Sequence, residues 1–193
     1  MISRFSVLFW GCITVLLMAS LFFGYNAEKE RRKSQSSGGR IENGSIVRLV
    51  RVLDGDSAIF AQEGEKPVVV RILGIKSFST KYEKDTVAAY GQAAIDTLER
   101  VMSGKPVRVM LNALPKDRYG RFIAVLYTDN QDVGLKLVRD GLALVYTVYP
   151  FPAMSVYLQE QETAKAVRRG FWANTEVAER AKSLIAQWQG QTQ

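Results

Sequence analysis

The sequence predicts an α+β domain in which a five-stranded OB-fold β-barrel is packed by about three helices and preceded by an N-terminal transmembrane helix. Two patterns predict this fold. A long uncharged apolar run opens the chain, and five short stretches rich in β-branched and aromatic residues follow, with helical patterns after the third and the fifth. At 193 residues, the chain has room for one domain and an appendage.

Residues 1–25 are predicted to be a transmembrane anchor, which makes the protein a single-pass membrane protein. Between Phe5 and Tyr25 there are 21 positions without a charge, about the length at which a helix crosses a bilayer core. A cleaved signal peptide is the alternative, although Tyr25-Asn26-Ala27 is a poor cleavage site. The Lys and Arg residues after the run favour a cytoplasmic domain.

The rest of the chain divides by composition into three parts. Residues 26–44 contain KERRK and SQSSGG, which are typical of a polar, basic linker. The OB domain is expected over 45–175. A C-terminal helical extension follows over 176–193, and its Ile185 and Trp188 could dock a protein partner in a membrane complex.

The strands are predicted from runs of β-branched and apolar residues. The first two are joined by the turn Asp54-Gly55-Asp56, and the third contains one charge, Arg71, in an otherwise apolar run. A charge in such a run is expected to have a specific partner. The five predicted strands are Ser45–Leu53, Ser57–Ala61, Val68–Ile75, Pro106–Leu111 and Phe122–Tyr127.

The helices are predicted from apolar residues at helical spacing and from the glycines that follow them. The segment 76–88 before the first of them is polar and irregular. The predicted helices are Ala89–Met102, Asp132–Arg139, Ser155–Arg169 and Thr175–Trp188.

The composition excludes several kinds of site. The one cysteine, Cys12, lies in the first apolar run and the chain has no histidine, so the domain has no disulfide and no Cys- or His-based metal site. Any metal must be a hard cation bound by carboxylates. The net charge of +7 permits an anionic partner such as nucleic acid or a lipid surface, and residues 5–25 would contact the membrane itself.

Six motifs occur in an order that resembles the staphylococcal nuclease (thermonuclease) family. The resemblance implies a five-stranded OB barrel with three helices, in which family enzymes cleave DNA and RNA with calcium. Family members are often exported, which opposes the cytoplasmic orientation. The motifs are Asp-Gly-Asp-Ser from Asp54, Val-Arg-Ile-Leu-Gly-Ile from Val70, Tyr-Gly-Gln-Ala-Ala from Tyr90, Asp-Arg-Tyr-Gly-Arg from Asp117, Leu-Val-Arg-Asp-Gly-Leu-Ala from Leu137, and Arg-Arg-Gly-Phe-Trp from Arg168.

The resemblance assigns roles to individual residues. Asp56 matches a calcium ligand, and Arg71 and Arg121 match the two catalytic arginines that stabilise the phosphate. Arg118, Tyr119 and Tyr149 stand at nucleotide-facing positions. The alternatives are structural: Asp56 could be a turn residue, Arg71 could form a buried ion pair with it, and the tyrosines could pack on the barrel.

The chain departs from the family after the third strand. Active members have Asp-Thr/Ala-Pro-Glu there, and this chain has Lys76-Ser77-Phe78-Ser79. Lys76 replaces the second calcium-binding aspartate, and Ser79 replaces the catalytic glutamate. An ammonium group repels a divalent cation, so we expect no cofactor, or calcium if activity is retained. Lys76 is instead expected to bind a phosphate directly.

The leading hypothesis is therefore a membrane-anchored, catalytically degenerate domain, in effect a pseudoenzyme, that binds nucleic acid or a protein partner. The replacement of two acidic residues by Lys76 and Ser79 favours a protein that is not an enzyme. The alternative is an active metal-dependent endonuclease with a rearranged site, in which Glu83 or Asp85 joins Asp56.

Overall fold

The computed structural model describes residue 10, residues 13–26 and residues 38–190. It forms two compact units, residues 1–36 and residues 37–193. In the first unit, residue 10 and residues 13–26 are helical. The barrel and the functional residues all belong to the second unit.

The predicted single-pass anchor is contradicted by the structure. No helix among the described residues is long and apolar enough to cross a membrane. The prediction rested on an uncharged run of 21 positions, of which residue 10 and residues 13–25 are described. Residues 5–9 and 11–12 of the predicted span lie outside the described residues.

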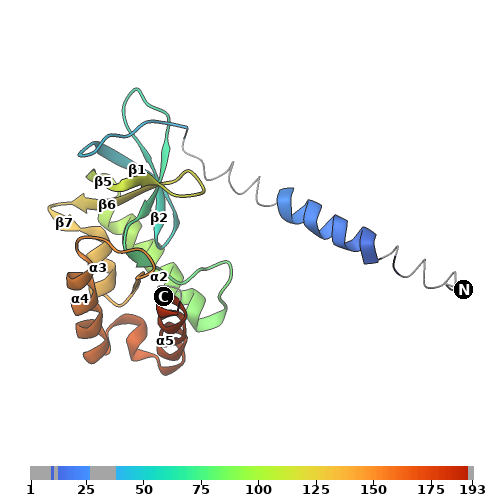
Figure 1. The fold of residues 1–193 in the computed structure, drawn as a ribbon. Coiled ribbons are helices and arrows are strands. Elements are labelled where there is room, and N and C mark those ends of the chain that lie inside the picture. Colours follow the sequence, from blue (N-terminus) through green and yellow to red (C-terminus); the bar gives the residue numbers. More distant parts are fainter. Residues whose placement is uncertain (1–9, 11–12, 27–37, 191–193) are drawn as a thin grey trace, which may run out of the picture. The chain divides into compact units, whose positions relative to one another are not determined.

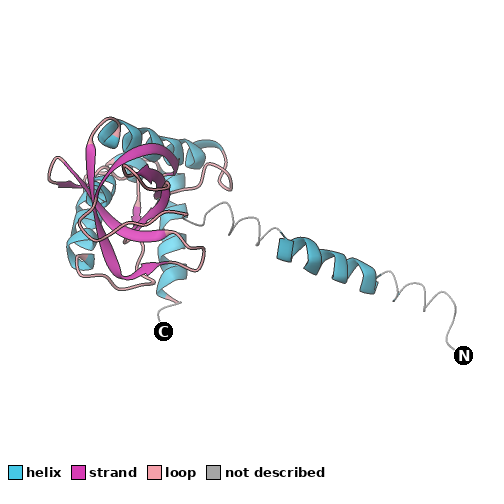
Figure 2. Cartoon of the chain, turned by 90° about the horizontal axis from the view of Figure 1, so that it is seen from above, coloured by secondary structure: helices cyan, strands magenta, loops and turns pink. Residues whose placement is uncertain are grey.

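Five strands form a closed barrel in the second unit (Figures 1 and 2). Neighbouring strands are antiparallel in the order β3-β2-β1-β5-β6, and a parallel pairing of β3 with β6 closes the ring. These strands are β1 (Ile46–Asp54), β2 (Ser57–Ala61), β3 (Val68–Ile72), β5 (Pro106–Lys116) and β6 (Phe122–Thr128). The mostly antiparallel sheet with helices confirms the predicted α+β class and is consistent with an OB-like barrel.

Three two-residue strands complete the sheets. β7 (Gln131–Asp132) pairs with β6 at the edge of the barrel sheet. β4 (Ile75–Lys76) and β8 (Leu144–Val145) form a separate antiparallel pair. This second pair carries Lys76 and leads directly into the segment that contains Tyr146.

The third strand differs from its prediction, which extended without interruption to Ile75. It ends at Ile72, and Gly74 then adopts a positive φ of 77°. The ring of Phe151 occupies the space that a Cβ on Gly74 would need. Glycine is favoured at this position for both reasons, and the turn that it permits carries the chain out of the barrel and into β4.

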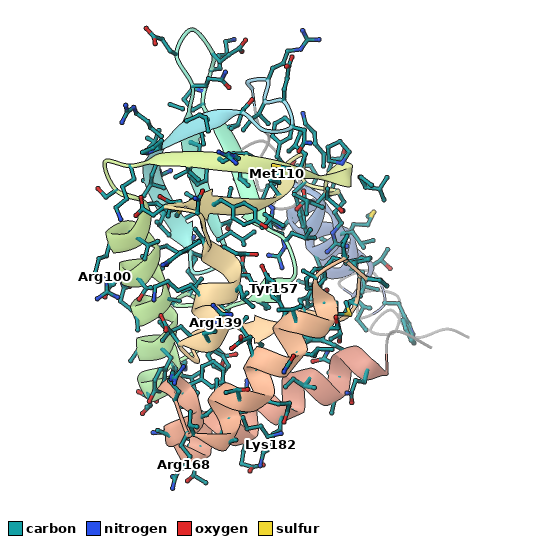
Figure 3. All side chains as sticks on the ribbon, turned by 90° about the vertical axis from the view of Figure 1, so that its left-hand side faces the viewer. Arg100, Met110, Arg139, Tyr157, Arg168 and Lys182 are labelled. Atoms are coloured by element: carbon teal, nitrogen blue, oxygen red, sulfur yellow. The ribbon has the colours of Figure 1, made fainter. Side chains whose placement is uncertain are left out.

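Four α-helices and one 3₁₀ helix are described in the second unit, and α3, α4 and α5 lie together at one end of the barrel (Figures 1 and 3). The first, α2, starts within the segment predicted to be irregular. The helices are α2 (Asp85–Met102), α3 (Val133–Arg139), α4 (Met154–Ala166), η1 (Gly170–Ala173) and α5 (Thr175–Gln189).

The buried apolar residues form two clusters. The larger fills the barrel and includes Phe60, Val70 and Leu126, and along β6 its buried residues alternate with partly exposed ones. The smaller lies among the helices around Phe171 and Trp172. The candidate site lies beside both clusters, because its residues come from the barrel strands and from the segments next to the helices.

Candidate functional site

The turn between β1 and β2 directs one carboxylate into the interior. Asp54 Oδ1 accepts hydrogen bonds from the Asp56 amide at 3.1 Å and from Ser57 Oγ at 2.6 Å. These bonds fix the turn in the way that aspartates commonly do. A Cβ on Gly55 would collide with Ala94 of α2 and with Ser77, so the turn packs tightly against both.

Asp56 is fully buried and its carboxylate is surrounded by donors. Arg71 Nη1 donates to Oδ1 at 2.8 Å, and Lys76 Nζ donates to Oδ2 at 2.9 Å. The Ser77 amide also donates to Oδ2, at 3.3 Å. The predicted residues Asp56, Arg71 and Lys76 therefore form one ion cluster, and the turn role considered for Asp56 belongs to Asp54 instead.

The surrounding charges determine the ionisation of the two aspartates. Burial opposes the charge on Asp56, but the Arg71 and Lys76 cations outweigh it and hold the pKa of Asp56 far below its usual range. Burial, together with the negative charge of Asp56, raises the pKa of Asp54. Asp56 thus stays ionised at neutral pH as the counter-ion of two basic residues.

This cluster does not fit a calcium ion. Calcium takes six to eight oxygen ligands, whereas both oxygens of Asp56 already accept bonds from cationic side chains. Lys76 places an ammonium group where a second carboxylate would be needed. In the described part of the chain, no three acidic, Cys or His residues are grouped so that they could hold a metal ion.

The residues proposed to rescue a metal site are engaged elsewhere or exposed. Glu83 Oε1 accepts two hydrogen bonds from Arg180 of α5, at 2.8 and 3.1 Å. Asp85 is an exposed residue at the start of α2, with a positive φ of 49°. Ser79 Oγ accepts a hydrogen bond from the Lys81 amide, which is a local loop contact.

A second basic group lies in the turn before β6. Asp117 Oδ2 accepts a hydrogen bond from Arg121 Nε at 2.7 Å, and Asp117 Oδ1 accepts from the Tyr119 and Arg121 amides. Arg118 donates to the Tyr119 hydroxyl at 2.6 Å and lies 4.8 Å from its ring centre. The predicted residues Arg118, Tyr119 and Arg121 therefore form one group, held by Asp117.

Tyr146 lies beside the buried arginine of the ion cluster. The Arg71 guanidinium lies 5.7 Å from the centre of the Tyr146 ring. Burial raises the pKa of Tyr146, and the nearby charge of Arg71 acts in the opposite direction. The exposed Tyr149 lies edge-on to Tyr146, with the ring centres 6.1 Å apart.

Tyr146 was not among the predicted site residues. It belongs to the run Leu144–Tyr149, in which the alternative of simple packing on the barrel applied to every tyrosine. Alternation along that run places Tyr146 on the same side as Leu144, which agrees with its packing against the smaller apolar cluster, but it could not have identified Arg71 as a neighbour.

The charges of the two groups favour an anionic ligand. Asp56 neutralises one of Arg71 and Lys76, and Asp117 neutralises one of Arg118 and Arg121, so each group has one positive charge in excess. Guanidinium and ammonium groups next to aromatic rings are suited to phosphate oxygens and to stacked bases.

Comparisons with known proteins agree with this architecture. A family model described as "Staphylococcal nuclease homologue" matches residues 69–174. The chain is 33% identical over 130 residues to an "Uncharacterized endonuclease" of Haemophilus influenzae, with 67% of each protein covered. It is 26% identical to the "Thermonuclease" of Staphylococcus hyicus over 163 residues. This alignment covers 84% of this chain and 96% of that protein.

A third relative is the "Endonuclease YncB" of Bacillus subtilis, 33% identical over 133 residues that cover 67% of this chain and 62% of the relative. The family model spans more than half of the chain, and it includes Arg71, Lys76, Arg121 and Tyr146. From the barrel, the ordered motifs and these matches, we conclude that the chain belongs to the staphylococcal nuclease family.

Proposed function

We propose that this domain binds nucleic acid through its two basic groups and has lost the metal-dependent cleavage that its family performs. The observation that supports the proposal is the ion pair between Lys76 Nζ and the buried Asp56 at 2.9 Å. It places a fixed positive charge where the family chemistry requires a cation held by carboxylates. Binding of phosphate is compatible with that charge, whereas metal binding is not.

Lys76 is able to contact a ligand without leaving Asp56 unpaired. Its side chain is 39% exposed, while that of Arg71 is only 15% exposed. Arg71 therefore serves as the buried counter-ion, and the more accessible Lys76 can share its protons with a phosphate oxygen. Arg118, which is exposed in the second group, supplies another contact.

The test is the binding of a fluorescent single-stranded oligonucleotide to the full chain by anisotropy at increasing salt. We expect the logarithm of the affinity to fall with the logarithm of salt by about 0.7 per phosphate contact. Arg118→Ala should lower this slope by about one contact, and Arg121→Ala should weaken binding by about 10-fold or more. Circular dichroism checks that the variants are folded.

The matched control is Arg100→Ala, which removes the same charge from the outer side of α2 (Figure 3). Arg100 donates to Thr97 of its own helix and belongs to neither basic group. The proposal would be contradicted if the affinity for the oligonucleotide did not depend on salt. It would also be contradicted if Arg100→Ala and Arg121→Ala lowered that affinity equally.

A metal-dependent endonuclease is the second candidate, because three relatives are named nucleases and Asp56, Arg71 and Arg121 are retained. Cleavage of the same oligonucleotide with calcium, magnesium or chelator separates the two. If the natural site is inactive, Lys76→Asp with Ser79→Glu should increase cleavage by about 100-fold or more, since it restores the missing carboxylates. Chelator-sensitive cleavage by the unaltered chain, abolished by Arg121→Ala, would instead establish the second candidate.

A further inference from the structure

The helix α5 is an integral part of the domain, although the match to the family model ends at residue 174, just before the helix begins. Asn174 caps the helix by accepting a hydrogen bond from the Val177 amide at 3.1 Å. Val177, Ala181 and Trp188 are buried in the smaller apolar cluster, which also contains Phe78. The apolar face of α5 is thus covered by its own domain, and one of its neighbours there belongs to the loop after Lys76.

The first contact from α5 to the site is the ion pair with that loop. Arg180 Nε and Nη2 both donate to Glu83 Oε1, at 3.1 and 2.8 Å, across 97 positions of sequence. The Glu83 amide donates to the Ser79 carbonyl at 3.0 Å. At the other end of the loop, the Ser77 amide donates to Asp56. Arg180 therefore anchors the far end of a loop whose near end contacts the ion cluster.

Arg180 also affects the charge that a ligand would meet. Glu83 carries a negative charge in the same loop as Lys76, and an unpaired carboxylate would repel an approaching phosphate. Pairing with Arg180 neutralises this charge and holds the side chain against α5. The ion pair therefore favours anion binding in two ways: it holds the Glu83 side chain against α5, and it neutralises the negative charge of that side chain.

The second contact is made by an aromatic ring. Trp188 is 7% exposed and meets the Tyr146 ring edge to face, with the ring centres 5.0 Å apart. Tyr146 in turn lies against Arg71. One end of α5 thus supports the ring that faces the buried arginine of the site.

We propose that α5 positions the candidate site, with Arg180 and Trp188 as positioning residues, and that it thereby sets the affinity for nucleic acid. Arg180 holds the loop over residues 77–83, and Trp188 holds Tyr146 against Arg71. The binding part of this inference rests on the proposed function. The positioning of the loop does not, and it is measured separately.

The experiment compares Arg180→Ala with Lys182→Ala in the full chain. Both variants remove one positive charge from α5, but Lys182 pairs with Glu179 of its own helix and lies at the helical end of the domain (Figure 3). Hydrogen exchange of the amides over 77–83 is measured in the free protein. We expect faster exchange in Arg180→Ala, unchanged exchange in Lys182→Ala, and restored protection in the charge swap Arg180→Glu with Glu83→Arg.

The second readout is oligonucleotide affinity. Arg180→Ala should weaken binding about 3- to 10-fold more than Lys182→Ala, and the charge swap should recover most of that loss. Trp188→Leu should weaken binding while the exchange over 77–83 stays unchanged, because its contact is with Tyr146. These differences would establish that Arg180 and Trp188 position two separate parts of the site.

The inference would be overturned if the amides over 77–83 exchanged equally fast in Arg180→Ala and Lys182→Ala. It would also be overturned if the charge swap restored neither the protection of these amides nor the affinity. An unaltered chain with no salt-dependent binding would refute the proposed function instead, and the exchange measurement would still decide whether α5 positions the loop.

Discussion

Asp56 stabilises the site as a buried anion between two cations. Without this carboxylate, Arg71 and Lys76 would lack the anion that both contact, and their like charges would repel each other. The same carboxylate accepts the Ser77 amide, so it also fixes the start of the loop. One residue therefore holds three segments of chain together.

Replacement of this residue should make stability depend less on pH. Asp56→Asn should lower the free energy of unfolding at neutral pH by about 2 to 3 kcal/mol, since it leaves Arg71 and Lys76 without a counter-ion. The pKa of Asp56 is held below its ordinary value of 3.8, so its contribution is complete above that pH and is lost as the pH falls further. The difference in stability between the two proteins should therefore shrink as the pH falls from about 4 to about 2 in urea titrations.

Asp54 has the opposite effect on the pH dependence of stability, because its pKa is shifted in the opposite direction from that of Asp56. Its pKa is raised, so its ionisation in the folded protein costs stability as the pH rises above its ordinary value. A stability difference between Asp56→Asn and the unaltered chain that stayed constant over this acidic range would contradict the depressed pKa of Asp56.

At the scale of elements, the break between β3 and β4 brings Lys76 to Asp56. The predicted strand, Val68–Ile75, would have run without a break up to the residue before Lys76. The positive φ of Gly74 and the Phe151 ring that covers it determine where the strand ends. Apolar runs do not report such breaks, because glycine is tolerated in both a strand and a turn.

Gly74→Ala should therefore lower the free energy of unfolding by more than the strain of a positive φ alone, because the added methyl group also meets Phe151. Gly64 is the matched control, since it has the same φ of 77° and open space where a Cβ would be added. We expect Gly64→Ala to cost about 1 kcal/mol and Gly74→Ala about 2 to 4 kcal/mol, measured by urea denaturation. Equal losses would show that Phe151 accommodates the added methyl group freely.

At the scale of the molecule, the ordered motifs predicted the family and the class of the fold, since each motif occupies a fixed place in one barrel. They also predicted that Asp56, Arg71 and Lys76 lie together. The contact of Arg180 with Glu83 was not predictable, because a pair 97 positions apart has no periodicity in sequence. The anchor prediction, which relied on the length of an apolar run, is contradicted because the described residues include no helix long and apolar enough to cross a membrane.

The parallel pairing of β3 with β6 also determines when the site can form during folding. The hairpins β1–β2 and β2–β3 connect near neighbours in the chain, and they already contain Asp56 and Arg71. In contrast, Arg71 reaches its register partner Ile123, two residues beyond Arg121, only by closing a long loop, which is slow. A chain arrested before this step would hold the ion pair of Asp56 with Arg71 but not the pairing of β3 with β6. The proposed binding of nucleic acid would thus require the closed ring and would arise late in folding.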